Sequence, residues 1–242
     1  SAAALYGSAA ANGAILITTK KGKEGKMNIQ LSSNTEFANP FLLPEFQKNY
    51  GSDGKVTSWG AKLPSDANRY DVKDFFRTAT TLTNSVALSG GTEKNQTYFS
   101  AASTNAEGLV PNNQYNRYNF TVRNTTHLLN DRLRIDASAS YILQNHLNMI
   151  NQGEYMNPLV GAYLMPRGYG LQRARQFERY NPTNHIYEQV WGDFAAGPDG
   201  TFNGSFAGDY TLQNPYWVAY RNLRESKRER NMLSLGVTLD LK

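Results

Sequence analysis

The side chains that could do chemistry in this chain are few and scattered. The three histidines, His127, His146 and His185, show neither the i, i+4 pairing nor the carboxylate spacing of a metal site. The absence of cysteine removes disulfides and thiolate metal sites. We therefore predict no catalytic residue, no metal site and no bound cofactor, and we do not expect an enzyme.

Carboxylates in the polar stretches leave two alternatives open. Asp66, Asp71 and Asp74 share one stretch, and Asp193 and Asp199 share another, so a carboxylate pair of the glycosidase type competes with simple solvated charges. Residues 198–204, Pro-Asp-Gly-Thr-Phe-Asn-Gly, have the oxygen-rich composition of a calcium loop. They lack the spaced acidic ligands and the terminal Glu of an EF-hand, which favours a plain turn.

Aromatic side chains offer the clearest binding chemistry. Trp59, Trp191 and Trp217 could stack on sugar rings, and the Tyr-rich loops could equally bind a peptide. For Tyr216 and Trp217, which stand in the stretch Asn-Pro-Tyr-Trp, an aromatic girdle or loop packing competes with ligand stacking. We retain Trp59, Trp191, Tyr216 and Trp217 as candidates for contact with a ligand or with other loops.

Charge and hydropathy exclude two further classes of protein. The formal net charge is +5, but the densest basic cluster, Arg221 to Arg230, is interleaved with Glu225 and Glu229. Because nucleic-acid binding needs one basic face or stripe, we do not expect a nucleic-acid partner. Apolar runs are far shorter than the roughly 20 residues of a membrane-spanning helix. A membrane β-barrel would escape this test, because its lipid-facing and lumen-facing residues alternate.

Apolar and polar residues alternate with period two in six segments, which predicts six β-strands. The clearest are 132–142 and 233–242, and the others lie near 27–32, 82–89, 95–104 and 118–123. Strands of about ten residues match the length needed to cross a bilayer at a tilt. In 95–104 the adjacent Tyr98 and Phe99 leave the lipid-facing side undecided.

The connections between these strands alternate between long and short. Long connections at 38–81, between the strands near 95–104 and 118–123 (about a dozen residues) and at 143–230 alternate with short turns at 91–94 and 128–131. This order is typical of outer-membrane barrels, which have long outer loops and short periplasmic turns. A soluble β-sandwich or a propeller fragment with long insertions is the alternative.

Within the longer loop, residues 155–165 predict a short helix over the barrel mouth. Its apolar residues fall on one helical stripe, and prolines flank it where a helix starts and stops. The stripe consists of Met156, Leu159, Val160, Tyr163 and Leu164.

The first twenty-two residues carry the most specific motif in the chain. A small-residue run leads through Asn12-Gly13 into an apolar strand and then into Lys20-Lys-Gly22. This stretch resembles the end of the plug domain in TonB-dependent outer-membrane transporters, with Ala14 where Val is usual. It is most similar to the SusC/RagA-like branch, which also commonly carries Asn-Pro-Tyr-Trp before a barrel strand. The matching plug residues are Tyr6, Gly7, Ala10, Gly13, Ile15, Ile17, Thr19 and Lys20.

The resemblance implies an all-β fold, part of a large antiparallel transmembrane β-barrel with long extracellular loops. Residues 1–24 would be the C-terminal end of the plug domain, with Tyr6, Gly7 and Gly13 as its motif. Residues 25–242 would be the N-terminal portion of the barrel, about six of the roughly 22 strands. The chain begins inside a motif, with neither an initiator Met nor a signal peptide, and we expect it to be a piece of a larger protein.

The same resemblance implies a function and a location. The cargo would be a nutrient too large for porins, an oligosaccharide or a peptide, imported together with a SusD-like surface lipoprotein. TonB would act through a region upstream of Ser1. The location would be the outer membrane of a Gram-negative, Bacteroidota-like bacterium. A siderophore or cobalamin receptor of the same superfamily, or a soluble cell-surface carbohydrate-binding β protein, are the alternatives.

Overall fold

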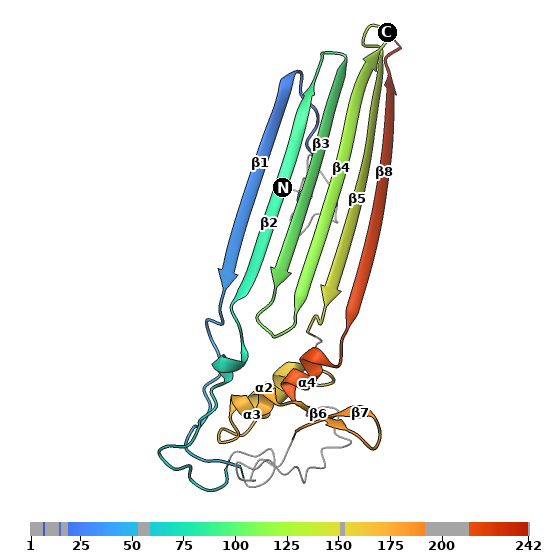
Figure 1. Ribbon diagram of the computed structural model, residues 1–242. Coiled ribbons are helices and arrows are strands. Elements are labelled where there is room, and N and C mark those ends of the chain that lie inside the picture. Colours follow the sequence, from blue (N-terminus) through green and yellow to red (C-terminus); the bar gives the residue numbers. More distant parts are fainter. Residues whose placement is uncertain are drawn as a thin grey trace.

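Six long antiparallel strands dominate the computed structural model, which describes residues 7, 15, 19–52, 59–150, 153–191 and 213–241. They form one sheet in the order β1-β2-β3-β4-β5-β8, so only the last pair skips elements along the chain (Figure 1). This confirms the predicted all-β antiparallel fold. The strands are β1 (Gly25–Ala38), β2 (Ala79–Gly91), β3 (Asn95–Glu107), β4 (Gln114–Leu128), β5 (Leu133–Leu147) and β8 (Glu225–Leu239).

The register gathers the apolar side chains on one face of the sheet. Residues directly opposite each other in neighbouring strands lie on the same face. Phe99 pairs with Leu88 on one side and with Val122 on the other, so Phe99 lies on the apolar face and Tyr98 on the opposite face. The sequence alone left that point undecided. The predicted apolar set of β5 and β8 also shares this face, through the pairs Leu133–Leu239, Ile135–Val237 and Ala137–Leu235.

Hydroxyl and amide side chains dominate the opposite face, which we call the polar face. Thr83 and Thr104 approach to 3.4 Å between their hydroxyl oxygens, and Thr121 and Ser140 to 3.0 Å. Small hydroxyl residues that pair across strands satisfy each other without a hydrophobic covering. The polar face can therefore border water.

Short turns and long loops lie at opposite ends of the sheet, as predicted. At the turn end, β2 and β3 are joined by 92–94, and β4 and β5 by 129–132. In the second turn Leu129, Asn130 and Asp131 all have positive φ, between 54° and 66°. The other end, the cap end, carries the connections 39–78, 108–113 and 148–224.

The predicted loop bounds 38–81 and 143–230 need correction. The strands continue toward the cap end beyond the segments in which apolar residues alternate, because polar residues there still pair in the ladder. Gln114 pairs with Leu147, and Leu147 with Glu225, so β4 and β8 begin earlier and β5 ends later than expected. The long loops are therefore shorter than the sequence pattern indicates.

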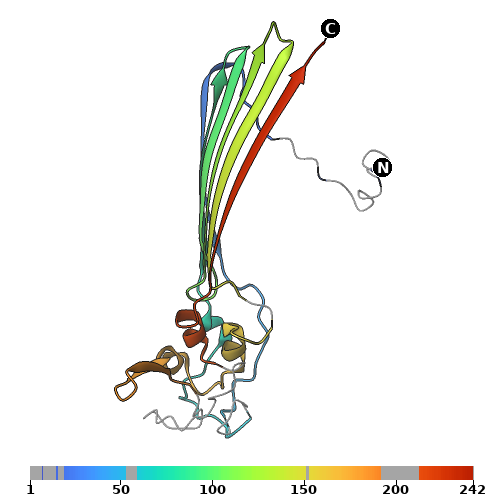
Figure 2. The ribbon, with the colours of Figure 1, turned by 90° about the vertical axis from the view of Figure 1, so that its right-hand side faces the viewer.

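The long loops fold into a compact unit at the cap end, which we call the loop cap (Figures 1 and 2). Its described residues form three short α-helices, one 3₁₀ turn and a two-stranded hairpin that the sequence pattern did not predict. These elements are η2 (Val72–Phe75), α2 (Pro158–Leu164), α3 (Leu171–Arg175), β6 (Glu178–Asn181), β7 (Ile186–Gln189) and α4 (Pro215–Tyr220).

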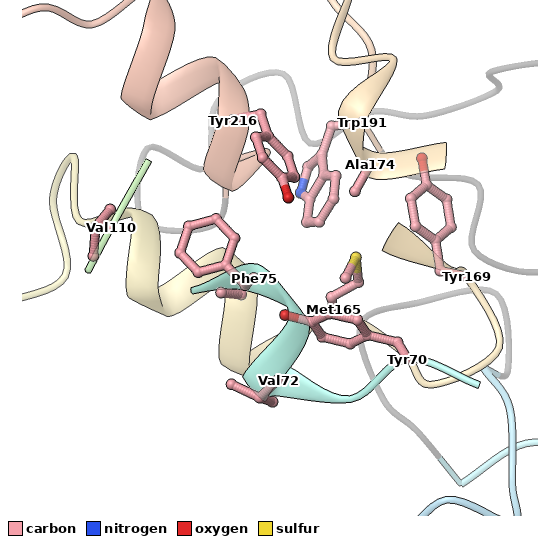
Figure 3. Packing of buried hydrophobic residues seen from close by; sticks show 10 residues of the cluster. Tyr70, Val72, Phe75, Val110, Met165, Tyr169, Ala174, Trp191 and Tyr216 are labelled. Atoms are coloured by element: carbon pink, nitrogen blue, oxygen red, sulfur yellow. The ribbon is translucent and has the colours of Figure 1, made fainter. Parts of the chain in front are cut away.

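The hydrophobic core lies in the loop cap and not in the sheet (Figure 3). Its largest fully buried side chains include Trp191, Tyr70, Phe75 and Met165, contributed by both long loops. Segments that are distant in sequence thus share one core, which fixes the cap as a unit.

Two kinds of feature are absent from the described part of the chain. No helix there is long and apolar enough to cross a membrane. No group of three or more His, Cys, Asp or Glu side chains there is arranged to hold a metal ion.

Candidate functional site

The predicted helix in the longer loop is present as α2, but its buried face differs from the expected stripe. Asn157 caps it by accepting a hydrogen bond from the Leu159 amide, and Pro158 follows at the first helical position. Pro158, Gly161 and Ala162 are buried, whereas Met156 and Leu164, two members of the stripe, are 41% and 48% exposed. The stripe prediction was therefore wrong in part.

Close approach of backbone explains why small residues occupy the buried face of α2. A Cβ placed on Gly161 would lie 2.2 Å from the carbonyl oxygen of Gln213 and 3.0 Å from Cδ of Pro215. Only glycine allows α2 and the start of α4 to lie this close. The large apolar side chains of the stripe cannot enter such a contact.

Asn214 joins three segments at this contact. Its side-chain oxygen accepts from the Tyr216 amide (2.9 Å), which caps α4, and its Nδ2 donates to the carbonyls of Ala174 (2.9 Å) and Val190 (3.0 Å). Its backbone amide donates to Oε1 of Gln189 at 2.7 Å. The residue is fully buried, so these bonds satisfy groups that water cannot reach.

Asn148 connects the loop cap to the strand ends. Its Nδ2 donates to the carbonyl of Ala219 in α4 (2.8 Å), and its Oδ1 accepts from the Arg224 amide just before β8 (2.9 Å). Its carbonyl accepts from Nδ2 of Asn113 in the β3–β4 connection at 2.8 Å. Its φ of 54° suits asparagine, which tolerates the left-handed region. The sequence did not single out Asn148. The tolerance of asparagine for the left-handed region is the one property that could have indicated its role.

Two of the four aromatic candidates lie in the core of the loop cap. Trp191 is 1% exposed and meets the Tyr169 ring edge-on at 5.7 Å between centroids. Tyr216 is 6% exposed and meets Phe75 in the same way at 5.5 Å (Figure 3). Burial raises the pKa of the Tyr216 hydroxyl. Both rings contact other loop residues.

The other two candidates lie outside that core. Trp59 is 72% exposed, with its ring 5.9 Å from that of Tyr50. Trp217 is half-buried in α4, and its carbonyl accepts from the Arg221 amide at the end of the helix. Direct contact of Trp59 or Trp217 with a ligand stays a prediction.

A cavity of about 460 Å³ opens between residues 40–48 and 70–73 of the loop cap. Arg167 lines it, with its guanidinium 4.4 Å from the centroid of the Phe46 ring and 5.2 Å from that of Tyr70. Nη2 of Arg167 donates to the Tyr163 carbonyl at 2.9 Å, while Nη1 has no hydrogen-bond partner among the described residues. Burial lowers the pKa of this guanidinium. Aromatic faces thus hold a cation in the cap.

The polar face below the loop cap carries a defined set of larger side chains. Each row across β4, β5 and β8 consists of directly paired residues. The ring centroids of Tyr115 and His146 lie 4.9 Å apart at the cap end. From the cap toward the turn end, the rows are Tyr115–His146–Ser226, Arg117–Gln144–Arg228, Asn119–Ile142–Arg230, Thr121–Ser140–Met232 and Arg123–Ser138–Ser234.

The polar face also contacts the segment that precedes β1. Nη1 of Arg123 donates to the Thr19 hydroxyl at 2.7 Å, while Nε and Nη2 form a bidentate pair with Asp136 at 2.8 and 2.7 Å. Gly22 is buried there, and a Cβ on it would lie 2.7 Å from the backbone of Gln96. Residues 19–22 therefore lie on the polar side of the sheet.

Only part of the predicted plug motif falls within the described residues. Gly7 has a φ of 77°, a conformation that favours glycine. Tyr6 and Gly13 lie outside the described residues.

Comparisons with known proteins show which proteins this chain resembles. No family model matches the chain. It is 31% identical to the TonB-dependent receptor SusC of Bacteroides thetaiotaomicron over 153 aligned residues. The aligned region covers 59% of the chain and 15% of that receptor. The chain is related to the SusC-type TonB-dependent receptors. This confirms the resemblance that the first twenty-two residues and the Asn-Pro-Tyr-Trp stretch predicted.

Two TonB-dependent receptors of Formosa agariphila also resemble this SusC-like chain. Receptor P39 is 32% identical over 127 residues, covering 48% of the chain and 12% of the receptor. Receptor P3 is 28% identical over 245 aligned positions, covering 95% of the chain and 21% of the receptor. The SusC-like chain thus spans about a fifth or less of the length of these relatives. Its six-stranded sheet is a segment of an antiparallel β-barrel wall.

Proposed function

We propose that the chain forms part of an outer-membrane transporter that imports an oligosaccharide or a peptide too large for porins. A SusD-like surface lipoprotein would cooperate at the cap end, and TonB would act through a region upstream of this chain. The observation that carries the proposal is the sheet with one apolar and one polar face, whose cap end holds the folded loops. The relatives named as TonB-dependent receptors support it.

The exposed apolar face supports a membrane location over the soluble alternative. On this face Leu31 is 76% exposed, Leu233 84% and Leu235 71%. A soluble protein rarely leaves so many large apolar side chains in contact with water. In a barrel wall the same side chains face lipid.

The apolar residues that follow β1 support a partner at the cap end. Phe41 is fully exposed and Leu42 is 86% exposed, in a segment that lies beyond the strands. Such side chains outside the bilayer mark a contact surface. We propose that they contact the surface lipoprotein.

We further propose that residues 1–24 end a plug domain and that the barrel begins at residue 25. Strand β1 starts at Gly25, which has a φ of 115°, so the chain bends sharply there. The contact between Thr19 and Arg123 supports a place for this segment on the lumen side.

The experiment uses the full-length receptor gene, expressed in its own host after deletion of the chromosomal copy. We expect growth on a cargo from an oligosaccharide and peptide panel to require both this gene and TonB. The double variant Phe41→Ser/Leu42→Ser should reach the outer membrane at normal levels but lose co-purification of the lipoprotein. Ile186→Ser, at a 52% exposed position in the hairpin, is the matched control. If growth on every oligosaccharide and peptide of the panel did not require TonB, that result would contradict the proposed transport.

A further inference from the structure

Three arginines on the polar face stand without a counter-charge. Arg117 and Arg228 flank Gln144 in one row, and Arg230 ends the next row. Strands lie about 4.8 Å apart, so the Cα atoms of Arg117 and Arg228 are separated by about 10 Å. Because β5 lies between them in an unbroken register, both guanidinium groups belong to the same patch of wall.

None of the three has an ion pair among the described residues. Arg117 donates only to a neutral partner, from Nε to Oδ1 of Asn119 at 2.9 Å. The carboxylate of Glu36 is on the same face but in β1, three strands away from β4. The patch therefore carries a net positive charge.

Other arginines and lysines of these strands do have partners. On the polar face near the turn end, Arg123 and Arg134 share Asp136, at 2.7 and 3.3 Å. On the apolar face, Lys227 pairs with Glu229 at 2.7 Å. The lack of a counter-charge is thus confined to the polar face just below the loop cap.

A surface that carries one sign of charge attracts ligands of the opposite sign. Arginine presents a planar fork of donors that matches carboxylate and sulfate groups, and it stays charged at every physiological pH. Resting on the proposed transport function, we infer that this patch, Arg117, Arg228 and Arg230, binds the acidic groups of an anionic oligosaccharide on its way through the barrel.

The surroundings of the patch favour a sugar over an acidic peptide. Hydroxyl and amide groups border the arginines, including Asn119, Gln144 and the Thr121–Ser140 pair. These groups suit a cargo rich in hydroxyls, and the apolar Ile142 and Met232 are the minority in the same rows. The rings of Tyr115 and His146, which are tilted by 55° to each other, lie directly on the cap side of the patch.

The test measures binding to the purified full-length receptor in detergent by calorimetry. The probes are tetragalacturonate, chondroitin sulfate tetrasaccharide, maltotetraose and tetraglutamate. We expect one of the two acidic oligosaccharides to bind most tightly, with an affinity that falls as salt rises. Arg117→Gln and Arg228→Gln should each weaken that binding by about tenfold or more.

Lys94→Gln, in the exposed β2–β3 turn, is the matched control, because it removes the same charge far from the patch. It should leave the affinity unchanged. Tighter binding of maltotetraose or of tetraglutamate, no binding of any probe, or unchanged affinity in the arginine variants would overturn the inference. Growth of the host that still requires the receptor and TonB would then show that transport itself is intact and that the cargo is of another class.

Discussion

Among single residues, two buried asparagines join the segments of the loop cap through their hydrogen bonds. Asn214 ties the end of α3, the residue after β7 and the start of α4 together, and Asn148 ties the cap to the strands. The Asn-Pro-Tyr-Trp stretch drew attention through its aromatic residues. Its buried asparagine is the member with the most hydrogen bonds, which follows from the capacity of an amide to donate and accept at once.

Replacing Asn214 by alanine should loosen the loop cap while the barrel stays assembled. The change leaves the carbonyls of Ala174 and Val190 and the Tyr216 amide without their partner. Each buried group left unsatisfied should lower the stability of the loop cap by about 1–3 kcal/mol. In the full-length receptor we expect faster tryptic cleavage after Arg173 and Arg175 in α3. The control is Asn184→Ala, at an exposed position of the hairpin. Equal cleavage rates in Asn214→Ala and the control would refute the joining role.

Gly161→Ala should destabilise α2, although alanine is ordinarily the better helix residue by roughly 1 kcal/mol. The added Cβ would lie 2.2 Å from the Gln213 carbonyl oxygen, so α2 and α4 must separate. We expect amide hydrogen exchange in 158–164 and 215–220 to accelerate, because the free energy needed to open these helices should fall by about 1–3 kcal/mol. Leu164→Ala, on the exposed side of the same helix, should have little effect. Slower exchange in Gly161→Ala would show that the close contact is absent.

At the scale of elements, the sequence predicted the parts of the strands in which one face is apolar. It did not predict the parts in which both faces are polar. Alternation in β5 and β8 identified the apolar set, because Ile135, Ala137, Leu235 and Val237 recur with period two. The cap-side ends of these strands contain residues such as Asn145 and Lys227, which pair in the ladder without an apolar signal. Backbone pairing fixes those ends, and pairing is not visible in a single strand.

The cap elements show a second limit of the sequence pattern. The helix α2 was predicted from its apolar residues and prolines, but its buried face depends on the partner helix α4. The strands β6 and β7 have four residues each, too few to show a period. Trp191 and Tyr216 were named as candidates by residue type, and only the fold places both in the core of the cap.

A charge on the apolar face of β8 should cost far more than the same charge on the polar face. Leu235 lies opposite Ala137 on the apolar face, and the adjacent Ser234 lies opposite Ser138 on the polar face. Leu235→Arg should lower the free energy of unfolding by about 2–4 kcal/mol, because an arginine near the bilayer midplane must leave water. Ser234→Arg should cost much less. The measurement is urea unfolding of the full-length receptor in lipid vesicles, and equal losses would favour a sheet covered by protein on both faces.

At the scale of the whole molecule, the two ends of the sheet differ in structure. The turn end is closed by the short connections 92–94 and 129–132, whereas the cap end carries a folded unit with its own core. Loops held by a rigid scaffold commonly carry recognition. Under the proposed function, the polar face between the two ends, with its uncompensated arginines near the cap, would border the path of the cargo.

The measurement that tests this account most directly is the accessibility of single cysteines to a membrane-impermeant maleimide in intact cells. The chain contains no cysteine, so Asn184→Cys in the β6–β7 turn and Glu93→Cys in the β2–β3 turn each add one exposed thiol. The full-length receptor would carry no other cysteine, and the host would lack the surface lipoprotein that could cover the cap. We expect labelling of the position-184 thiol in intact cells, and labelling of the position-93 thiol only after the outer membrane is permeabilised. Equal labelling of both thiols in intact cells, or labelling of the position-93 thiol alone, would contradict a barrel wall that spans the outer membrane with its loop cap outside.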